Sequence, residues 1–273
     1  MFSEKFILLQ QEGFLTQSSL SQGLTFLRKA NIGDKERGLF YSAFFQLSIG
    51  VERFMKIIVI LDFMVKNDLK IMTDRELKHN YGHKIKDLYS AVKRIATEND
   101  VNTDGFFHDG IEWDIIHFLH EFALTARYYN LSQLGGTSNS KDPLAEWWKI
   151  IFDLYLDEVT DAKRIKIQNE SLATCDARGS NSFTMFHSLS GEIMTEYDLL
   201  THPRIVEASS PHSVWFIIKI LSPLFSVLKK CQRDVHTIEV SKGFNFPNVP
   251  YMDEFFPFLY SNRQSSLRRK KWN

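Results

Sequence analysis

The chain has 273 residues, with 33 basic and 33 acidic side chains and an apolar content of 44%. This composition excludes a disordered chain, and the zero net charge excludes a uniformly basic nucleic-acid coat protein while still allowing a local basic groove. Cys175 and Cys231 are the two cysteines and lie far apart, so the sequence predicts neither a zinc knuckle nor a redox motif, but two reduced thiols.

The termini and apolar runs predict a cytoplasmic protein without a membrane partner. The apolar run Phe6–Leu9 is too short for a signal-peptide core, and no small-residue cleavage site follows it. The longest apolar stretch, Ile57–Leu61 with Phe63–Val65 after Asp62, is well short of the roughly 20 residues that a membrane span needs.

Apolar residues at helical spacing predict a short helix within residues 14–30 and a long helix from residue 35 to residue 68. One face of the long helix is apolar over about seven turns. Its members are Phe40, Phe44, Leu47, Val51, Met55, Ile58, Leu61 and Val65. Gly50 lies inside this helix, where glycine costs about 1 kcal/mol relative to alanine, so we expect another helix to pack closely against it.

Three further helices are predicted at residues 73–99, 110–134 and from Pro143 to about residue 170. Thr73 and Glu76 have the spacing of a capping box, and Pro143 has the favoured first helical position. Gly82 falls inside the first of these helices and again suggests a close helix contact. Long helices joined by short polar loops predict an all-α fold with an antiparallel four-helix bundle as its core.

The C-terminal third is expected to extend this bundle. Residues 173–181 read as a linker, residues 182–200 and 211–237 as helices with a kink at Pro223, and residues 238–240 as a short extended strip. The aromatic, proline-containing tail predicts irregular chain packed across the body. The predicted domains are therefore an N-terminal helical arm at 1–34, a helical bundle at 35–172 and a C-terminal helical extension at 173–273.

The sequence has none of the common phosphate-binding, zinc-protease or nucleophile-elbow motifs, and we expect no cofactor. His117 and His120 lie one turn apart beside Glu121, which suits a metal, but no partner motif accompanies them, so no metal site is predicted. The basic run Arg268–Lys271 is expected to be solvated and to add a weak, salt-sensitive attraction to nucleic acid.

A few polar residues on predicted helices remain as candidates for a site. Glu52 and Arg53 lie in the most apolar helix, where charges are either paired or placed at a cavity. His83 is read either as a histidine at a helix contact or as an acid–base group.

The second group of candidates ends the predicted helix 110–134. Arg127 and Asn130 lie one turn apart, so they either hold a phosphate together or cap the helix end. Tyr128 lies between them and is suited to stacking on a base.

The stretch LFYSAFFQLSIGVERFMKIIVIL, followed by a helix with YGHKIKDLY, resembles the HEPN superfamily (higher eukaryotes and prokaryotes nucleotide-binding) over roughly residues 35–165. The resemblance implies a helical bundle that often forms dimers, occurs in bacterial toxin–antitoxin and phage-defence systems, and in many members is a metal-independent ribonuclease. The family's nuclease motif is an arginine followed by a histidine four to six residues later. Arg127 matches the arginine, but residues 128–134 contain no histidine.

Two functions follow from these observations. The first is a HEPN-like protein that binds RNA or a nucleotide, with a protein partner or a second copy. If it cleaves RNA, Arg127 stabilises the phosphate, His83 acts as acid or base, and Glu52 and Asn130 hold the geometry. Arg53, Asn130 and Tyr128 are the residues expected to bind the substrate. The second is a non-catalytic helical interaction or scaffold protein in which Arg53, His83 and Arg127 form a buried polar network.

Overall fold

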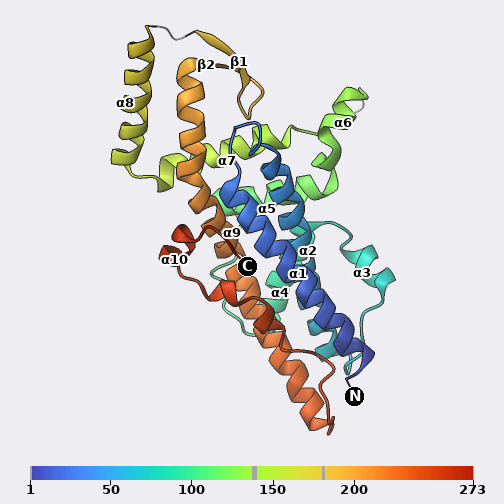
Figure 1. Cartoon of the computed structure of the whole chain (residues 1–273). Helices are drawn as coiled ribbons and strands as arrows, with labels where there is room; N and C mark the ends of the chain where they lie inside the picture. The colour runs from blue at the N-terminus through green and yellow to red at the C-terminus, as the bar shows by residue number, and fades with distance from the viewer. Residues whose placement is uncertain (1, 137–139, 180–181, 273) are drawn as a thin grey trace.

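The computed structural model describes residues 2–136, 140–179 and 182–272, and these residues are mostly helical, as predicted (Figure 1). The α-helices are α1 Glu4–Lys29, α2 Gly38–Lys66, α3 Asp74–Asn80, α4 Ile85–Glu98, α5 Gly110–Leu124, α6 Tyr129–Leu134, α7 Pro143–Glu158, α8 Asp161–Arg178, α9 Glu196–Ser241 and α10 Arg263–Arg268. Short 3₁₀ turns lie at η1 Ala126–Tyr128, η2 Met252–Phe255 and η3 Pro257–Tyr260, and strands β1 Phe183–His187 and β2 Ile193–Thr195 form one antiparallel hairpin. No helix in the described part of the chain is long and apolar enough to cross a membrane.

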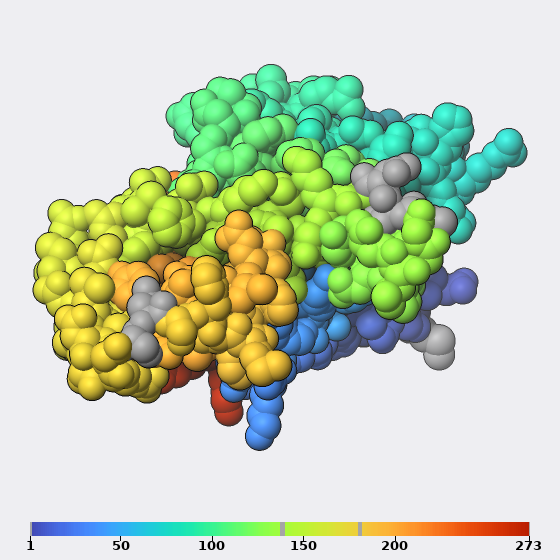
Figure 2. All heavy atoms as spheres, turned by 90° about the horizontal axis from the view of Figure 1, so that it is seen from above, coloured from blue at the N-terminus to red at the C-terminus, as the bar shows by residue number. Residues whose placement is uncertain are grey.

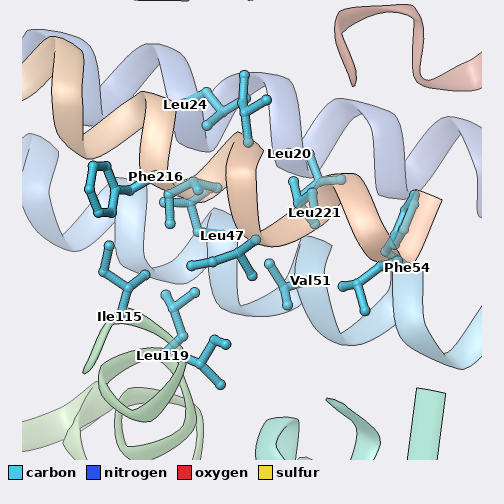
Figure 3. Close-up of a cluster of buried hydrophobic side chains, with 14 of the residues drawn as sticks. Leu20, Leu24, Leu47, Val51, Phe54, Ile115, Leu119, Phe216 and Leu221 are labelled. Atoms are coloured by element: carbon cyan, nitrogen blue, oxygen red, sulfur yellow. The ribbon is translucent and has the colours of Figure 1, made fainter. Parts of the chain in front are cut away.

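The helix α2 lies at the centre, where it packs against α1, α4, α5 and α9. The apolar face predicted for it is buried, because these four neighbours surround it. Figure 3 shows the resulting core, in which leucines of α1, leucine, valine and phenylalanine of α2, and residues of α5 and α9 meet. Its labelled members are Leu20, Leu24, Leu47, Val51, Phe54, Ile115, Leu119, Phe216 and Leu221.

Two reciprocal glycine contacts set the approach of α1 to α2. A Cβ atom on Gly50 would lie 2.8 Å from the side chain of Leu20, and one on Gly23 would lie 2.7 Å from the side chain of Leu47. From Leu20 to Gly23 the residue number rises along α1, while the residue that each contacts in α2 falls from Gly50 to Leu47. The two helices are therefore antiparallel. The close helix contact predicted at Gly50 is confirmed.

Three of the predicted helices are interrupted. The helix expected at 73–99 is divided into α3 and α4, because Gly82 takes a left-handed φ of +49° that a continuing helix excludes. An added Cβ on Gly82 would meet only the Lys78 carbonyl oxygen, at 3.6 Å, so the expected helix contact there is wrong. The capping box of Thr73 and Glu76 is confirmed.

The two later helices are also interrupted, but not by a left-handed glycine. The helix expected at 110–134 ends at Leu124 and resumes as η1 and α6, and the one expected from Pro143 ends at Glu158. The second break falls at Val159, whose extended φ and ψ of −90° and 127° end α7. The residues after it form α8, which continues to Arg178 through most of the predicted linker and across the predicted boundary at residue 172.

The C-terminal third differs most from expectation. Residues 183–195, predicted as helical, form the β1–β2 hairpin, in which Phe183 pairs with Thr195 and His187 with Ile193. The predicted strip at 238–240 is helical, because α9 runs through 46 residues, about 69 Å at 1.5 Å per residue. Pro203, Pro211 and Pro223 lie inside α9. Pro211 has no backbone N–H to donate to the Glu207 carbonyl, and the Ser210 hydroxyl donates a hydrogen bond to that carbonyl instead.

The helix α8 and the hairpin lie against the N-terminal half of α9 and project from the body (Figure 1). Seen from above, these yellow and gold segments form one end of the molecule, and the cyan segments around α3 protrude at the other (Figure 2). The tail returns across the body as η2, η3 and α10, as the sequence predicts. It ends in a buried indole, that of Trp272.

Candidate functional site

Glu52 and His83 form a hydrogen-bonded pair where α2 passes the turn between α3 and α4. The Glu52 side chain is buried, and its oxygens lie 3.2 and 3.1 Å from His83 Nδ1. Lys56, one turn along α2, donates to the same carboxylate at 2.7 Å. The break at Gly82 places His83 here, with its side chain 63% exposed. With Nδ1 donating to Glu52, Nε2 is the imidazole acceptor, which is the arrangement of an oriented general base.

Arg53 does not join this pair. Its guanidinium lies 2.5 Å from the Glu12 carboxylate of α1, and both side chains are partly exposed. This ion pair joins α1 to α2 on a different side of α2 from His83, since consecutive helical residues point about 100° apart. The contact gives Arg53 a structural partner and matches the paired interpretation of this residue.

Arg127, Tyr128 and Asn130 lie together at the end of α5, in η1 and the start of α6. Asn130 Nδ2 donates to the hydroxyl of Tyr41 at 3.2 Å, and burial, followed by the charge of Asp142, raises the pKa of Tyr41 to about 12. Arg127 is half-buried, and its Nε atom is buried without a hydrogen-bond partner among the described residues. Tyr128 is 66% exposed. This end of α5 therefore presents a guanidinium beside an open aromatic ring.

The structure does not bring the six candidates to one groove. Asn130 contacts Tyr41 near the start of α2, whereas the carboxylate of Glu52 lies eleven residues later on the same helix, about 16 Å along its axis at 1.5 Å per residue. Figure 1 shows α6 and α3 at correspondingly different levels beside α2. Glu52 with His83, Arg53 with Glu12, and the Arg127 group are three separate places.

A pocket of about 850 Å³ lies between α5 and α7. Its charged lining residues are mostly acidic, and its apolar lining includes Phe118, Phe122 and Ile150. The polar lining residues on the two helices are Asp114, His117 and Glu121 of α5 and Glu146, Lys149 and Asp153 of α7.

The charge of this pocket suits a cation better than a phosphate. Lys149 and Lys141 both lie against Glu146, at 2.6 and 3.7 Å, so the remaining carboxylates keep an excess of negative charge. The pKa of Asp153 is raised by burial and then by neighbouring aspartates, Asp157 and Asp114. The sequence contains the polar residues of this pocket at helical spacing, because each of the two helices carries them three and four residues apart. The sequence does not show that the polar faces of α5 and α7 lie opposite each other.

The two histidines considered as metal ligands do not act together. His117 lines the pocket 3.8 Å from Glu121, whereas burial lowers the pKa of His120 and its Nδ1 atom is buried without a partner. Across residues 2–136, 140–179 and 182–272, no three His, Cys, Asp or Glu side chains are grouped as metal ligands.

Comparison of the chain with protein-family models, with curated proteins and with solved structures gives no match. The side chains of the chain offer an oriented imidazole at His83, a guanidinium at Arg127 that forms no ion pair in the part of the chain that the structure describes, and an acidic pocket between α5 and α7.

Proposed function

We propose that this protein binds single-stranded RNA as a HEPN-like member of a bacterial defence or toxin–antitoxin system. The observation that carries the proposal is the Arg127 group. Arg127 is half-buried and forms no ion pair among the described residues, so the terminal nitrogens of its guanidinium can hold a phosphate through charge-assisted hydrogen bonds. The exposed ring of Tyr128 beside it stacks on a base. Asn130, fixed by Tyr41, supports the same surface.

RNA is favoured over a mononucleotide because of where the negative charges lie. The pocket between α5 and α7 is large enough for a nucleotide, and Thr125 and Ala126, next to Arg127 in the chain, line it. Its carboxylates repel a phosphate group. A single RNA strand that crosses the surface at Arg127 and Tyr128 avoids this pocket.

Cleavage, in this proposal, needs two copies of the chain. The helices α2, α4, α5 and α7 are the proposed HEPN-like four-helix bundle, and in that family the histidine and the arginine of two protomers meet. Within one chain His83 contacts Glu52 in the middle of α2, whereas Asn130, beside Arg127, contacts Tyr41 in the first turn of α2. In this proposal His83 of one copy would therefore accept a 2′-hydroxyl proton while Arg127 of the other stabilises the phosphate charge. Glu52 would orient His83 in this step.

Binding is tested by fluorescence anisotropy with a labelled RNA oligonucleotide in EDTA. Arg127→Ala is expected to weaken binding about tenfold or more, the effect of losing a charge-assisted hydrogen bond. Arg53→Ala is the matched control, because it also removes one arginine, but one already paired with Glu12. RNA that does not bind the wild-type protein, or equal loss in both variants, would refute the proposal.

Cleavage is tested with labelled total RNA in EDTA, using Arg127→Ala, His83→Ala and an equal mixture of the two. Each variant alone is expected to be inactive. In the mixture half of the dimers are heterodimers, each with one intact composite site of two, so about a quarter of wild-type activity should return. Intact RNA with all the proteins would restrict the function to binding.

A second candidate function, a non-catalytic interaction protein, is favoured by the hairpin. Phe183 is 77% exposed and Met185 is 95% exposed, and both belong to a two-stranded sheet with free edges. Exposed apolar strands of this kind recruit other chains. Sedimentation of the wild-type protein at rising concentration, compared with Phe183→Ser and Met185→Ser, tests it. Association that the two substitutions leave unchanged would exclude the hairpin as the interface.

A further inference from the structure

The basic run near the C-terminus is held against the body at both ends. Before it, α10 packs on α9 and buries Ser266. After it, Trp272 is only 1% exposed, and its backbone N–H donates to Oγ1 of Thr25 on α1 at 3.0 Å. The ring of Phe258 lies edge-on to the Trp272 indole, with centroids 6.4 Å apart. The sequence suggested a loose terminus here, whereas these contacts fix residues 266–272 on α1 and α9.

The cations between these two anchors have no carboxylate partners among the described residues. None of the ion pairs in the described part of the chain includes Arg268, Arg269, Lys270 or Lys271, although Arg263, in the first turn of α10, pairs with Glu158. Arg269 lies over the Trp272 ring, 5.0 Å from its centroid, while Arg268, Lys270 and Lys271 are exposed.

Lys29 extends this group of cations. It is exposed and also absent from the ion pairs of the described residues, and it lies one helical turn after Thr25, which binds the Trp272 backbone. The four side chains Arg268, Lys270, Lys271 and Lys29 are called the C-terminal basic surface below. They gather uncompensated positive charge in a chain whose net charge is zero.

We propose that the C-terminal basic surface binds the phosphate backbone of single-stranded RNA. This inference rests on the proposed function and deepens it, because it supplies a sequence-independent contact in addition to Arg127. A run fixed at both ends loses little freedom when a strand binds, so its charges contribute more to affinity than those of a loose tail.

The composition of the surface favours a polyanion over a lipid surface. Phe258 and Trp272 of the tail point into the core, whereas Tyr260 is 62% exposed. Between residues 261 and 272, the stretch that carries the basic run, no large apolar side chain is strongly exposed. Stable attachment to a membrane needs an apolar anchor or a lipid chain in addition to basic residues. RNA phosphates need only the cations.

The expected salt dependence follows from counterion release. Four phosphate contacts on a single strand give a slope of log K against log salt of about −2.8, at roughly −0.7 for each contact. Between 50 and 200 mM salt this slope lowers affinity about 50-fold. Removing three of the four cations should therefore reduce the slope by about 2 and weaken binding most at low salt.

The test compares the triple variant Arg268→Gln, Lys270→Gln, Lys271→Gln with wild type. Anisotropy of a labelled oligouridine is followed from 50 to 200 mM salt. The variant keeps Trp272 and its bond to Thr25, and an unchanged melting temperature shows that the fold is intact. The expected result is the loss of about two units of slope. A slope equal to that of wild type would overturn the inference.

A matched control removes the same charge elsewhere. Lys163→Gln, Lys166→Gln, Arg178→Gln takes three exposed cations from α8, and its slope should equal that of wild type. Equal loss in both triple variants would overturn the inference, because it would show a general effect of net charge. If the C-terminal variant loses binding to vesicles with anionic lipids but not to RNA, the surface is a membrane surface and the inference is wrong.

Failure of this inference differs from failure of the proposed function. If Arg127→Ala weakens RNA binding and the C-terminal triple variant does not, the proposed function stands and the basic surface is excluded. If the wild-type protein binds no RNA at 50 mM salt, both are wrong.

Discussion

Replacing Gly50 with alanine probes the contact that sets α1 against α2. The added Cβ would lie 2.8 Å from two side-chain carbons of Leu20 and 3.0 Å from its backbone nitrogen. Overpacking of this kind costs about 1–3 kcal/mol, and the backbone contact, which cannot rotate away, favours the upper part of that range. Alanine recovers about 1 kcal/mol of helix propensity. The expected net loss in the free energy of unfolding is therefore about 1–2 kcal/mol, roughly 2–8 °C in melting temperature.

The assay is urea and thermal unfolding followed by circular dichroism, with Gly38→Ala as control. Gly38 begins the same helix, and an added Cβ there meets nothing within 4 Å. It should leave stability unchanged or raise it. Gly23→Ala adds a Cβ 2.7 Å from Leu47 at the same interface. The double variant should cost less than the sum of its parts, because helices already separated by one methyl group accept the second more easily. A Gly50→Ala protein as stable as the Gly38→Ala protein would refute this account of the packing.

Three further predictions concern buried groups. The thiol of Cys231, with its pKa raised to about 12 by burial and then by nearby aspartates, should not react with Ellman's reagent at pH 8 until the protein unfolds, and rapid reaction of the native protein at this cysteine would contradict it. Burial lowers the pKa of His202, so the unfolded chain binds more protons below about pH 6.5 and stability should fall as pH drops below that value. His202→Asn should reduce this slope in urea midpoints measured from pH 7.5 to 5.5, leaving the part due to the half-buried His120 and His212, whose pKa values burial also lowers, and an unchanged slope would contradict it. Trp272→Ala should cost about 3–5 kcal/mol in urea unfolding, because the indole is fully buried, and a cost below 1 kcal/mol would show that the tail is not anchored there.

The helical fold was predictable because the apolar period of the long helices is unbroken over many turns. The burial of Phe44, Leu47 and Val51 follows from that period alone. The helix break at Gly82 was not predictable. A glycine in a helical pattern either continues the helix or takes a positive φ, and the apolar pattern is the same in both cases. The pairing of Glu52 with His83 depends on that break. It therefore was not accessible from the spacing of the two residues.

The hairpin and the end of α9 were missed for opposite reasons. Phe183 and Met185 are exposed in β1, so the strand lacks the buried face that makes alternation visible. Ile238 and Val240 are β-branched and suggested an extended strip, but tertiary contacts prevail over propensity. Between them Glu239 is buried and accepts a hydrogen bond from the Asn248 backbone at 2.7 Å, which fixes this turn of helix against the loop that follows α9.

The separation of His83 from Arg127 leads to a test that needs no substitution. If RNA is bound by Arg127 within one chain but cleaved only where His83 of a second chain meets it, binding and cleavage depend differently on protein concentration. Binding should titrate with the concentration of the chain, whereas the specific rate of cleavage should fall on dilution as dimers dissociate. Both quantities are measured on one dilution series, by anisotropy and by gel analysis of the RNA. Cleavage that stays constant per chain while sedimentation shows monomers would contradict the two-chain site, because one chain would then hold both His83 and Arg127 within reach of the same phosphate.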